Sequence, residues 1–412
     1  MSTLAPATGA PVPWRDDARV VGVVAFAHLV SHFFQLVLPP LFPWLREAFA
    51  LSYAELGFIM SVLFTVSGLG QAAAGFIVDR HGALPTLVGG LLALAAGAVV
   101  AASASGYAGL LGAAVLFGLG NAVFHPVDFW LINHRVSVPR LGPAFSVHGL
   151  SGSLGWAAAP VFMLAVATPF GWRAAVLAAA VLPLAAIAGA WWSRDVLSRA
   201  ANVEPVAGTP PVSSGFAFLR LRAVWLCFGF FACVAAALGG VQGFSPTVFE
   251  RAYGLALAPA AMSVTFYMLA SGVGMLAGGW LVTHSRVLER NITLALLLAV
   301  GAAALVASGW PGATLALALM AVMGFGSGLS GPSRDLLIRA AAPPGATGRV
   351  YGVVYSGLDV GIAVGPPLLG RLLDHGIVGG IYYVVAACLF AGLLLARAVA
   401  AQTRATGPAS PA

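Results

Sequence analysis

LPTLVGGLLALAAGAVVAAS, residues 84–103, is a run of twenty residues without a charged side chain. A helix of about 20 such residues spans the hydrocarbon core of a bilayer. Comparable runs recur along all 412 residues, of which 60% are hydrophobic and 8% charged, with a mean hydropathy of +0.95. Soluble domains carry about 25% charged residues, so this composition excludes a water-exposed surface. The sequence therefore predicts an all-α, polytopic membrane protein.

Twelve such runs are predicted to form transmembrane helices, and they cover residues 20–43, 54–78, 84–103, 108–132, 143–167, 173–193, 223–249, 259–283, 291–309, 313–338, 348–373 and 377–399. The longest polar stretch, 194–222, divides them into two sets of six. We therefore predict a cytoplasmic tail 1–19, a six-helix bundle 20–193, a cytoplasmic linker 194–222, a second six-helix bundle 223–399 and a cytoplasmic tail 400–412.

The distribution of arginine predicts the orientation. All 20 basic residues are arginine, and cytoplasmic loops of membrane proteins carry an excess of positive charge. With the N-terminus in the cytoplasm, sixteen arginines lie inside, and four lie outside, namely Arg46, Arg173, Arg251 and Arg371. The bias predicts an inner (plasma) membrane protein with both termini in the cytoplasm. The first 19 residues lack the apolar core of a cleavable signal, so the first run is expected to remain as a helix.

The composition argues against several functional classes. The net charge of +7 suggests nucleic acid, but the arginines stand singly between apolar runs and form no basic patch. The three cysteines, Cys227, Cys233 and Cys388, lie in apolar runs and form no disulfide or metal-type pattern. The sequence contains no phosphate-binding loop and no nucleophile constellation. We therefore expect that the protein is not an enzyme and binds no cofactor. We expect a monomer whose partners are a small-molecule substrate, protons and the lipid bilayer.

An internal repeat relates the two sets of runs. With the chain shifted by 206 residues, about 45 residues align without a gap, which pairs Gly118 with Gly324, Gly120 with Gly326, Pro126 with Pro332, Ile132 with Ile338, Gly142 with Gly348, Gly155 with Gly361 and Pro160 with Pro366. Parallel repeats related by an axis along the membrane normal are a transporter architecture, with the substrate site at the interface between the repeats.

The loop after the second run carries the sequence GFIVDRHG, Gly75 to Gly82. It resembles the G-x-x-x-D-R-x-G loop motif of the major facilitator superfamily, although Ala83 and Leu84 stand where a basic pair is usual. The resemblance implies twelve helices in two pseudo-symmetric six-helix bundles. It also implies that Asp79 and Arg80 brace the cytoplasmic side of the outward-facing state, as gating residues. A tight turn with one interfacial ion pair is the alternative.

Two further segments are similar to one branch of this superfamily. FGLGNAVFHPVDF, residues 117–129, resembles the small-residue run ending in His-Pro of the fosmidomycin-resistance branch. GIAVGPPLLG, residues 361–370, looks like the G-x-x-x-G-P motif of drug:proton antiporters, which is normally found in the fifth helix and here lies in the eleventh. The resemblance implies proton-coupled export of a small organic solute.

Polar and ionisable residues inside the runs are candidate site residues, because such groups are costly in hydrocarbon and usually face a cavity. Their spacing places several on shared helical faces, and these residues are His28, Ser31, His32 and Gln35 in the first run, Asn121, His125 and Asp128 in the fourth, and Gln242 in the seventh. The resemblance implies that helices 1, 4, 7 and 10 line the central cavity, so we expect these faces to meet there.

The shift of 206 residues places Asp128 on Arg334 in the tenth run. One prediction is that the two side chains form an ion pair that closes the cytoplasmic gate. The other is that Arg334 binds an anionic group of the substrate through two parallel hydrogen bonds. Alternatively, both lie near the cytoplasmic helix ends, where Arg334 only reaches the lipid headgroups.

Asp359 lies in the middle of the eleventh run, where an ionised carboxylate is most costly. We expect it to rest protonated and to carry the coupling proton, with Asp128 and His32 as further candidates; the alternative is an aspartate that joins two helices. His148 is a secondary candidate, for which bonding between helices is favoured. His28 and His32 also have the spacing of two metal ligands, but no acidic or cysteine partner lies on their helix. A hydrogen-bonded cavity lining is therefore favoured over a metal site, and a site completed by His125 or Asp128 from another helix is the alternative.

The resulting prediction is a secondary active transporter that moves a small organic solute by alternating access, with proton-coupled export as the leading mechanism. Three alternatives remain. One is an uptake symporter for a small organic acid bound by Arg334, and the second is a carrier of a metal or metallophore that uses His28 and His32. The third is a non-transporting membrane scaffold, which the polar helical faces argue against.

Overall fold

The computed structural model describes residues 13–198, 217–284, 288–341 and 347–406, and within these ranges every regular element is a helix. Eleven helical stretches of the described residues are long and apolar enough to cross a membrane. The one predicted span not among these eleven, 348–373, corresponds to α15 (Thr347–Asp374), which is 28 residues long. The prediction of an all-α polytopic membrane protein with twelve transmembrane helices in two pseudo-symmetric bundles is confirmed.

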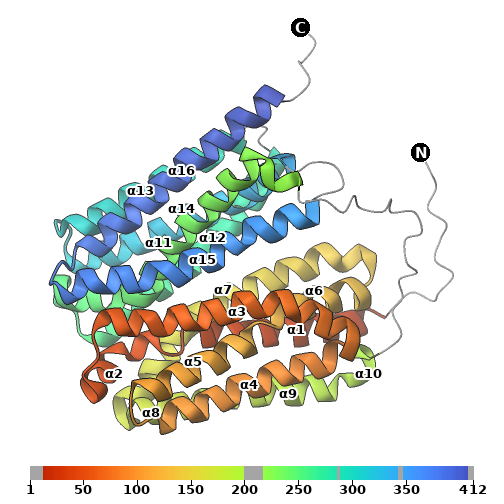
Figure 1. Cartoon of the computed structure of the whole chain (residues 1–412), viewed down its shortest axis with the longest axis horizontal. Helices are drawn as coiled ribbons and strands as arrows, with labels where there is room; N and C mark the ends of the chain where they lie inside the picture. Colours follow the sequence, from red (N-terminus) through yellow and green to blue (C-terminus); the bar gives the residue numbers. More distant parts are fainter. Residues whose placement is uncertain (1–12, 199–216, 285–287, 342–346, 407–412) are drawn as a thin grey trace.

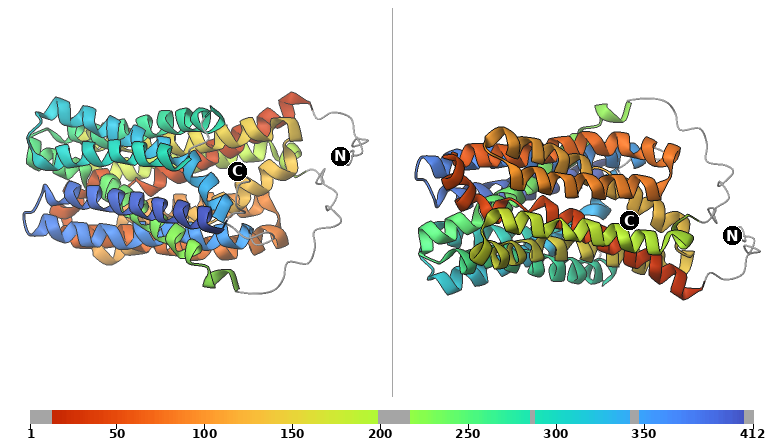
Figure 2. Two further views of the ribbon diagram at one scale, coloured as in Figure 1. Left: turned by 90° about the horizontal axis from the view of Figure 1, so that it is seen from above. Right: turned by 90° about the horizontal axis from the view of Figure 1, so that it is seen from below.

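The first half of the chain forms α1 (Trp14–Gln35), α2 (Phe42–Phe49), α3 (Tyr53–His81), α4 (Ala83–Ser103), α5 (Tyr107–Asn121), α6 (Phe124–Arg135), α7 (Leu141–Phe170), α8 (Trp172–Ala179), α9 (Val181–Trp192) and α10 (Arg194–Leu197). The second half forms α11 (Arg222–Tyr253), α12 (Leu257–His284), α13 (Leu288–Ser308), α14 (Ala313–Ala341), α15 and α16 (Gly380–Thr406). Figures 1 and 2 show the halves side by side, with their long helices running in a common direction. We call the end at which α1 begins and α16 ends the terminus end, and the opposite one the distal end.

Three predicted spans are interrupted in the structure, each near a proline. The first span ends at Gln35, and Pro39 and Pro40 start a short 3-10 turn before α2. The fourth span is divided into α5 and α6, and the sixth into α8 and α9. Pro126 and Pro183 are each the third residue of the later helix, where the missing backbone N–H is best tolerated. Hydropathy alone treats these spans as continuous, which explains the difference.

The outer surface of the bundle is apolar. Leu69, Phe76 and Phe170 are 73%, 79% and 74% exposed, and many other large hydrophobic side chains are similarly uncovered. In water, so much exposed apolar surface favours aggregation, whereas in a bilayer it contacts lipid chains. The exposure pattern therefore agrees with the eleven membrane-spanning stretches.

The two halves touch closely toward the distal end, where α3 packs on α15. A Cβ atom added at Gly57 would lie 2.5 Å from the carbonyl oxygen of Pro366, so the two backbones are in direct contact. One turn further along α3, the hydroxyl of Ser61 donates a hydrogen bond to the carbonyl of Ala363. On the other side of the molecule, Thr265 of α12 donates to the carbonyl of Ala157 on α7 at 3.0 Å.

The same two helix pairs separate toward the terminus end. A Cβ atom at Gly272 of α12 would still meet Ser153 of α7 at 3.6 Å, but one at Gly279, two turns later, would meet nothing within 4 Å. Gly75 of α3 is equally open. A hollow of about 330 Å³ lies between α7 and α12 in this region and is lined by Gly149 and Gly279 among others. The structure is therefore closed at the distal end and parted at the terminus end.

Candidate functional site

A cavity of about 270 Å³ lies between the two halves, at the middle of the long helices. The wall from the first half is polar, and its residues are His32, Gln35, Ser67, Gln71, Asn121, His125 and Trp156, together with Phe64. The wall from the second half is mostly apolar, and it includes Val234, Leu238, Tyr267, Met268, Met275, Leu358 and Ile362. Asp359 is the acidic residue on that apolar wall. The cavity thus suits a solute with one polar and one apolar side.

The polar face predicted on α1 is buried inside the first half. His28, Ser31, His32 and Gln35 are all less than 9% exposed, and His32 and Gln35 reach the cavity. Successive members are three or four residues apart, which places them above one another on one side of the helix. The break between α5 and α6 brings a second polar face to the same place.

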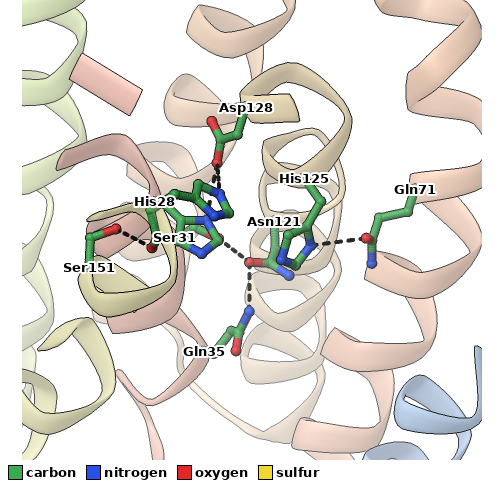
Figure 3. Close-up of polar contacts among 9 residues, drawn as sticks. His28, Ser31, Gln35, Gln71, Asn121, His125, Asp128 and Ser151 are labelled. Atoms are coloured by element: carbon green, nitrogen blue, oxygen red, sulfur yellow. Dashed lines mark hydrogen bonds and ion pairs between the residues drawn. The ribbon is translucent and has the colours of Figure 1, made fainter. Parts of the chain in front are cut away.

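Asn121, the last residue of α5, connects three helices. Its carbonyl oxygen accepts hydrogen bonds from the hydroxyl of Ser31 and from Nε2 of Gln35, the latter at 3.0 Å. Its Nδ2 donates to the hydroxyl of Ser67 on α3 at 2.7 Å. Gln35 in turn accepts a hydrogen bond from the indole N–H of Trp156 at 2.9 Å. Figure 3 shows Asn121 between Ser31 and Gln35. This network fixes the polar wall of the cavity.

Four of the eight histidines of the chain form a cluster around the carboxylate of Asp128, which is fully buried. Oδ2 of Asp128 lies 3.1 Å from Nδ1 of His28 and 3.1 Å from Nε2 of His148. The rings of His28 and His148 are stacked, with centroids 3.7 Å apart. His32 lies next to His28, at a centroid distance of 4.3 Å. The contacts around Asp128 are drawn in Figure 3.

His125 joins this cluster from the cavity side. Its ring centroid lies 5.3 Å from that of His28 and 6.1 Å from that of His32. Nδ1 of His125 shares a hydrogen bond of 3.1 Å with Oε1 of Gln71 on α3. Two groups in the described part of the chain bring three possible ligand atoms within 4.8 Å of one another: His28 with His32 and His125, and His28 with Asp128 and His148. The sequence showed the spacing of His28 and His32 and left His125 or Asp128 as possible partners from another helix, but it did not indicate His148 as a ligand.

Asp359 faces the cavity from α15 and also touches the opposite half. A Cβ atom added at Gly68 of α3 would lie 2.8 Å from Cγ of Asp359. Within the described residues, the carboxylate of Asp359 makes no hydrogen bond or ion pair. It therefore lies at the interface of the two halves without a fixed partner.

Gln242 and Arg80 do not lie at the cavity. Gln242 is 2% exposed and is not part of the cavity wall, and its amide atoms have no hydrogen-bond partner in the described part of the chain. Arg80 is exposed at the end of α3. The side chains of Arg334 and Asp79 lie outside the described ones, so the pairing of Asp128 with Arg334 and the gating role of Asp79 and Arg80 stay predictions.

The residues of the cavity wall that were not singled out from the sequence include Ser67, Gln71, Trp156 and Tyr267. Ser67 and Gln71 are four residues apart on α3, and the spacing rule used for the first and fourth runs also applies to them. Trp156 and Tyr267 carry no such signal, since aromatic residues are common in transmembrane helices. Only the packing of the helices shows that they face the cavity.

The sequence model of the Major Facilitator Superfamily matches residues 24–366, which is most of the chain. This chain belongs to the major facilitator superfamily. Its sequence is 26% identical over 360 residues to the uncharacterized MFS-type transporter YfnC of Bacillus subtilis strain 168, covering 85% of this chain and 86% of that protein. It is 21% identical over 390 residues to the fosmidomycin resistance protein of Escherichia coli strain K12, with 92% of each chain covered. The resemblance to this superfamily is thereby confirmed.

Solved structures show the same fold. A bacterial homologue of the human lysosomal transporter Spinster, in an inward-facing and unoccupied conformation, matches with a TM-score of 0.77 at 16% identity, over 98% of this chain and all of the other. The inward-facing and occupied conformation of that protein matches with a TM-score of 0.71 at 15% identity, over the same shares of the two chains. These likenesses extend the fold assignment across both halves, and the protein is a multi-pass membrane transporter of this superfamily.

Proposed function

We propose that this transporter exports a small organic solute across the plasma membrane in exchange for protons, by alternating access of the central cavity. The superfamily membership supports a transporter, and the cavity between the halves supplies a place for the solute. The structure is closed at the distal end and parted at the terminus end, which corresponds to one of the two states that alternating access requires.

The arginine distribution supports the direction in which the cavity opens. Sixteen of the 20 arginines lie in segments assigned to the side of the termini, and this excess is typical of the cytoplasmic side. With that orientation, the parted terminus end faces the cytoplasm and the structure represents an inward-facing state. The hollow between α7 and α12 lies on that side, and Met275 lines both it and the cavity, so we expect a solute from the cytoplasm to enter there.

The position of Asp359 is the observation that carries the proton coupling. Its carboxyl group lies in the cavity wall and against Gly68 of the other half, and no partner holds it among the described residues. An ionised carboxylate in this apolar wall is costly, so the protonated form is favoured while the cavity is dry. When water or a cationic group reaches the cavity, the ionised form becomes accessible. Movement of the halves therefore changes the environment of this one carboxyl group.

The relatives support export of an organic compound. One of them is named for resistance to fosmidomycin, and removal from the cell is a direct way to resist a toxic compound. The cavity agrees with a small solute that has a polar side toward Asn121 and Gln35 and an apolar side toward Leu238 and Met268. We expect such an amphipathic compound to be the substrate.

Replacement of Asp359 by asparagine tests the coupling. We propose to place the full chain in proteoliposomes that contain a pH-sensitive dye and to impose a fosmidomycin gradient. The wild type is expected to move protons in the opposite direction. Asp359→Asn is expected to abolish proton movement and uphill transport while keeping exchange of labelled fosmidomycin at equal concentrations.

Glu47→Gln, which changes an exposed carboxylate outside the cavity, is the matched control and should behave as wild type. Uphill transport by Asp359→Asn at the wild-type level would place the proton site elsewhere, with Asp128 and His32 as the next candidates. If the wild type exchanges fosmidomycin but moves no protons, the antiport mechanism is wrong.

A further inference from the structure

Three imidazole rings meet at the inner wall of the cavity with the arrangement of metal ligands. His28 and His32 come from α1 and His125 from α6, and one donor nitrogen of each lies within 4.8 Å of the other two. In a tetrahedral zinc site with bond lengths of about 2.0–2.1 Å, ligand atoms are about 3.3 Å apart. The ring centroids lie 4.3 to 6.1 Å apart, so binding of an ion requires the donor nitrogens to move closer together by rotation of the side chains.

One of the rings, His125, is hydrogen-bonded to an outer partner of the kind that orients metal-binding histidines, and a second, His28, lies beside a carboxylate. The carboxylate of Asp128 lies 3.1 Å from Nδ1 of His28, and the side-chain oxygen of Gln71 lies 3.1 Å from Nδ1 of His125. A histidine that binds a metal through one nitrogen usually donates the other N–H to a carboxylate or carbonyl oxygen. In both residues this arrangement leaves Nε2 as the nitrogen available to a ligand.

The third ring, His32, is buried beside Gly152 of α7 and makes no side-chain hydrogen bond in the described part of the chain. It is 8% exposed, and neither of its nitrogens has a partner in the described part of the chain. A buried polar group without a partner costs about 1–3 kcal/mol, and an ion bound at the cavity wall would supply the missing partner. Gly152 of α7 leaves the space that this ring fills, since a Cβ atom there would lie 2.7 Å from Cε1 of His32.

We propose that His28, His32 and His125 bind one divalent transition-metal ion, and that the transported solute is a small organic chelator that completes the coordination from the cavity. Imidazole ligands suit Zn²⁺, Cu²⁺, Ni²⁺ and iron. Three protein ligands leave a fourth tetrahedral position open, as in zinc sites that bind a further ligand. His32 and His125 both line the cavity, so this position faces the solute.

The second group of possible ligands, His28 with Asp128 and His148, has an orienting role. Asp128 is 0% exposed and neither it nor His148 lines the cavity. His148 shares a hydrogen bond with Asp128 and stacks on His28, which holds the carboxylate and the ring in place. Binding of the ion does not depend on transport, whereas transport of the chelator rests on the proposed function.

Cobalt binding to the purified full chain tests the ion site. We propose to titrate metal-free protein in detergent with Co²⁺ and to follow the visible absorption of tetrahedral cobalt together with the heat of binding. One Co²⁺ per chain is expected for the wild type. His32→Ala and His125→Ala are expected to weaken binding at least about tenfold, and Gln71→Leu, which changes only an outer partner, by about tenfold.

His375→Ala is the matched control, because His375 is exposed at the distal end. It should bind Co²⁺ as the wild type does. Absence of saturable binding to the wild type, or equal binding by the wild type and the two ligand variants, overturns the ion site. The wild-type titration keeps this test decisive even when a ligand variant does not fold.

The chelator is tested with acetohydroxamate and histidine, which offer oxygen and nitrogen donors. Either compound is expected to shift the spectrum of the cobalt-loaded wild type as it enters the fourth position. If neither shifts it, the chelator assignment is wrong although the ion site stands. If Co²⁺ does not bind but fosmidomycin still exchanges with protons, this inference fails and the proposed function remains.

Discussion

The carboxyl group of Asp359 on α15 packs directly on Gly68 of α3, so that Cγ lies 2.8 Å from the position of an added Cβ. On the distal side of this contact the two helices touch again through Ser61 and Gly57. On the terminus side Gly75 meets nothing within 4 Å. Asp359 therefore marks the point along this helix pair where the halves part, and a change of its charge acts at that point.

Gly68→Ala is expected to slow transport about tenfold. The added methyl group overlaps the side chain of Asp359, and overpacking of this kind costs about 1–3 kcal/mol, of which about 1.4 kcal/mol corresponds to tenfold. To make room for the methyl group, α3 and α15 must separate slightly at Gly68 and Asp359, where they are in contact in this state. Counterflow of labelled fosmidomycin in proteoliposomes measures the rate.

Gly89→Ala on α4 is the matched control, since its Cβ would meet nothing within 4 Å. It should transport at the wild-type rate. Wild-type transport by Gly68→Ala would show that the contact with Asp359 yields without consequence.

The distal end is held by a carboxylate that binds the start of a helix in the other half. Asp374, the last residue of α15, accepts hydrogen bonds from the backbone N–H groups of Tyr53 and Ala54, at 2.7 and 3.0 Å. These N–H groups are at the N-terminus of α3, where they lack intrahelical partners and where the helix dipole favours negative charge. The contact therefore stabilises the closed arrangement of the two halves at the distal end.

Asp374→Ala is expected to favour opening at the distal end, because each lost charge-assisted hydrogen bond weakens the closed state by about 1.5–3 kcal/mol. Spin labels on cysteines that replace Glu47 and Ile377, both exposed near this end, should report a larger population of long distances. Glu250→Ala, which removes an exposed carboxylate at the same end, should leave the distances unchanged. An unchanged distance distribution in Asp374→Ala would show that this contact does not hold the distal end closed.

Hydropathy predicted the helices of this protein well because the bilayer requires long apolar segments. The run 84–103 corresponds to α4, Ala83–Ser103, and the run 54–78 to α3, Tyr53–His81. The break between α5 and α6 was not predicted, because hydropathy does not register the missing backbone N–H of Pro126, which favours the start of a new helix just before it. In the site this break matters, since Asn121 and His125 lie on either side of it.

The spacing of polar residues identified one face of each helix but not the partners of that face. His28 and His32 were placed on a common face, and the structure has their rings side by side. The contact of Asp128 with His148 joins α6 to α7, and that of His125 with Gln71 joins α6 to α3. Such contacts depend on how helices pack around each other, which no single-helix pattern contains. The functional roles of these residues stay predictions.

The sidedness of the membrane can be tested with single cysteines. In a variant in which Cys227, Cys233 and Cys388 are replaced by alanine, Trp310→Cys at the distal end is expected to react with an impermeant maleimide in intact cells. Trp310 is 80% exposed, so access is not limited by packing. Ser198→Cys, exposed at the terminus end, should react only after permeabilisation. The reverse pattern would invert the orientation and turn the proposed inward-facing state into an outward-facing one.

Asn121→Ala is expected to lower the thermal stability of the protein substantially. The amide oxygen accepts hydrogen bonds from Ser31 and Gln35 and the amide nitrogen donates to Ser67, so one substitution leaves three buried groups on α1 and α3 without their partner. Each unsatisfied buried group costs about 1–3 kcal/mol, although a water molecule from the adjacent cavity can replace part of the loss. We therefore expect a destabilisation of about 2–4 kcal/mol, measured as a lower unfolding temperature in detergent.

Asn133→Ala is the matched control, because Asn133 is exposed and its side chain donates only to the carbonyl of Phe129 in its own helix. Equal unfolding temperatures for the two variants would show that the network around Asn121 does not hold the polar wall of the cavity in place.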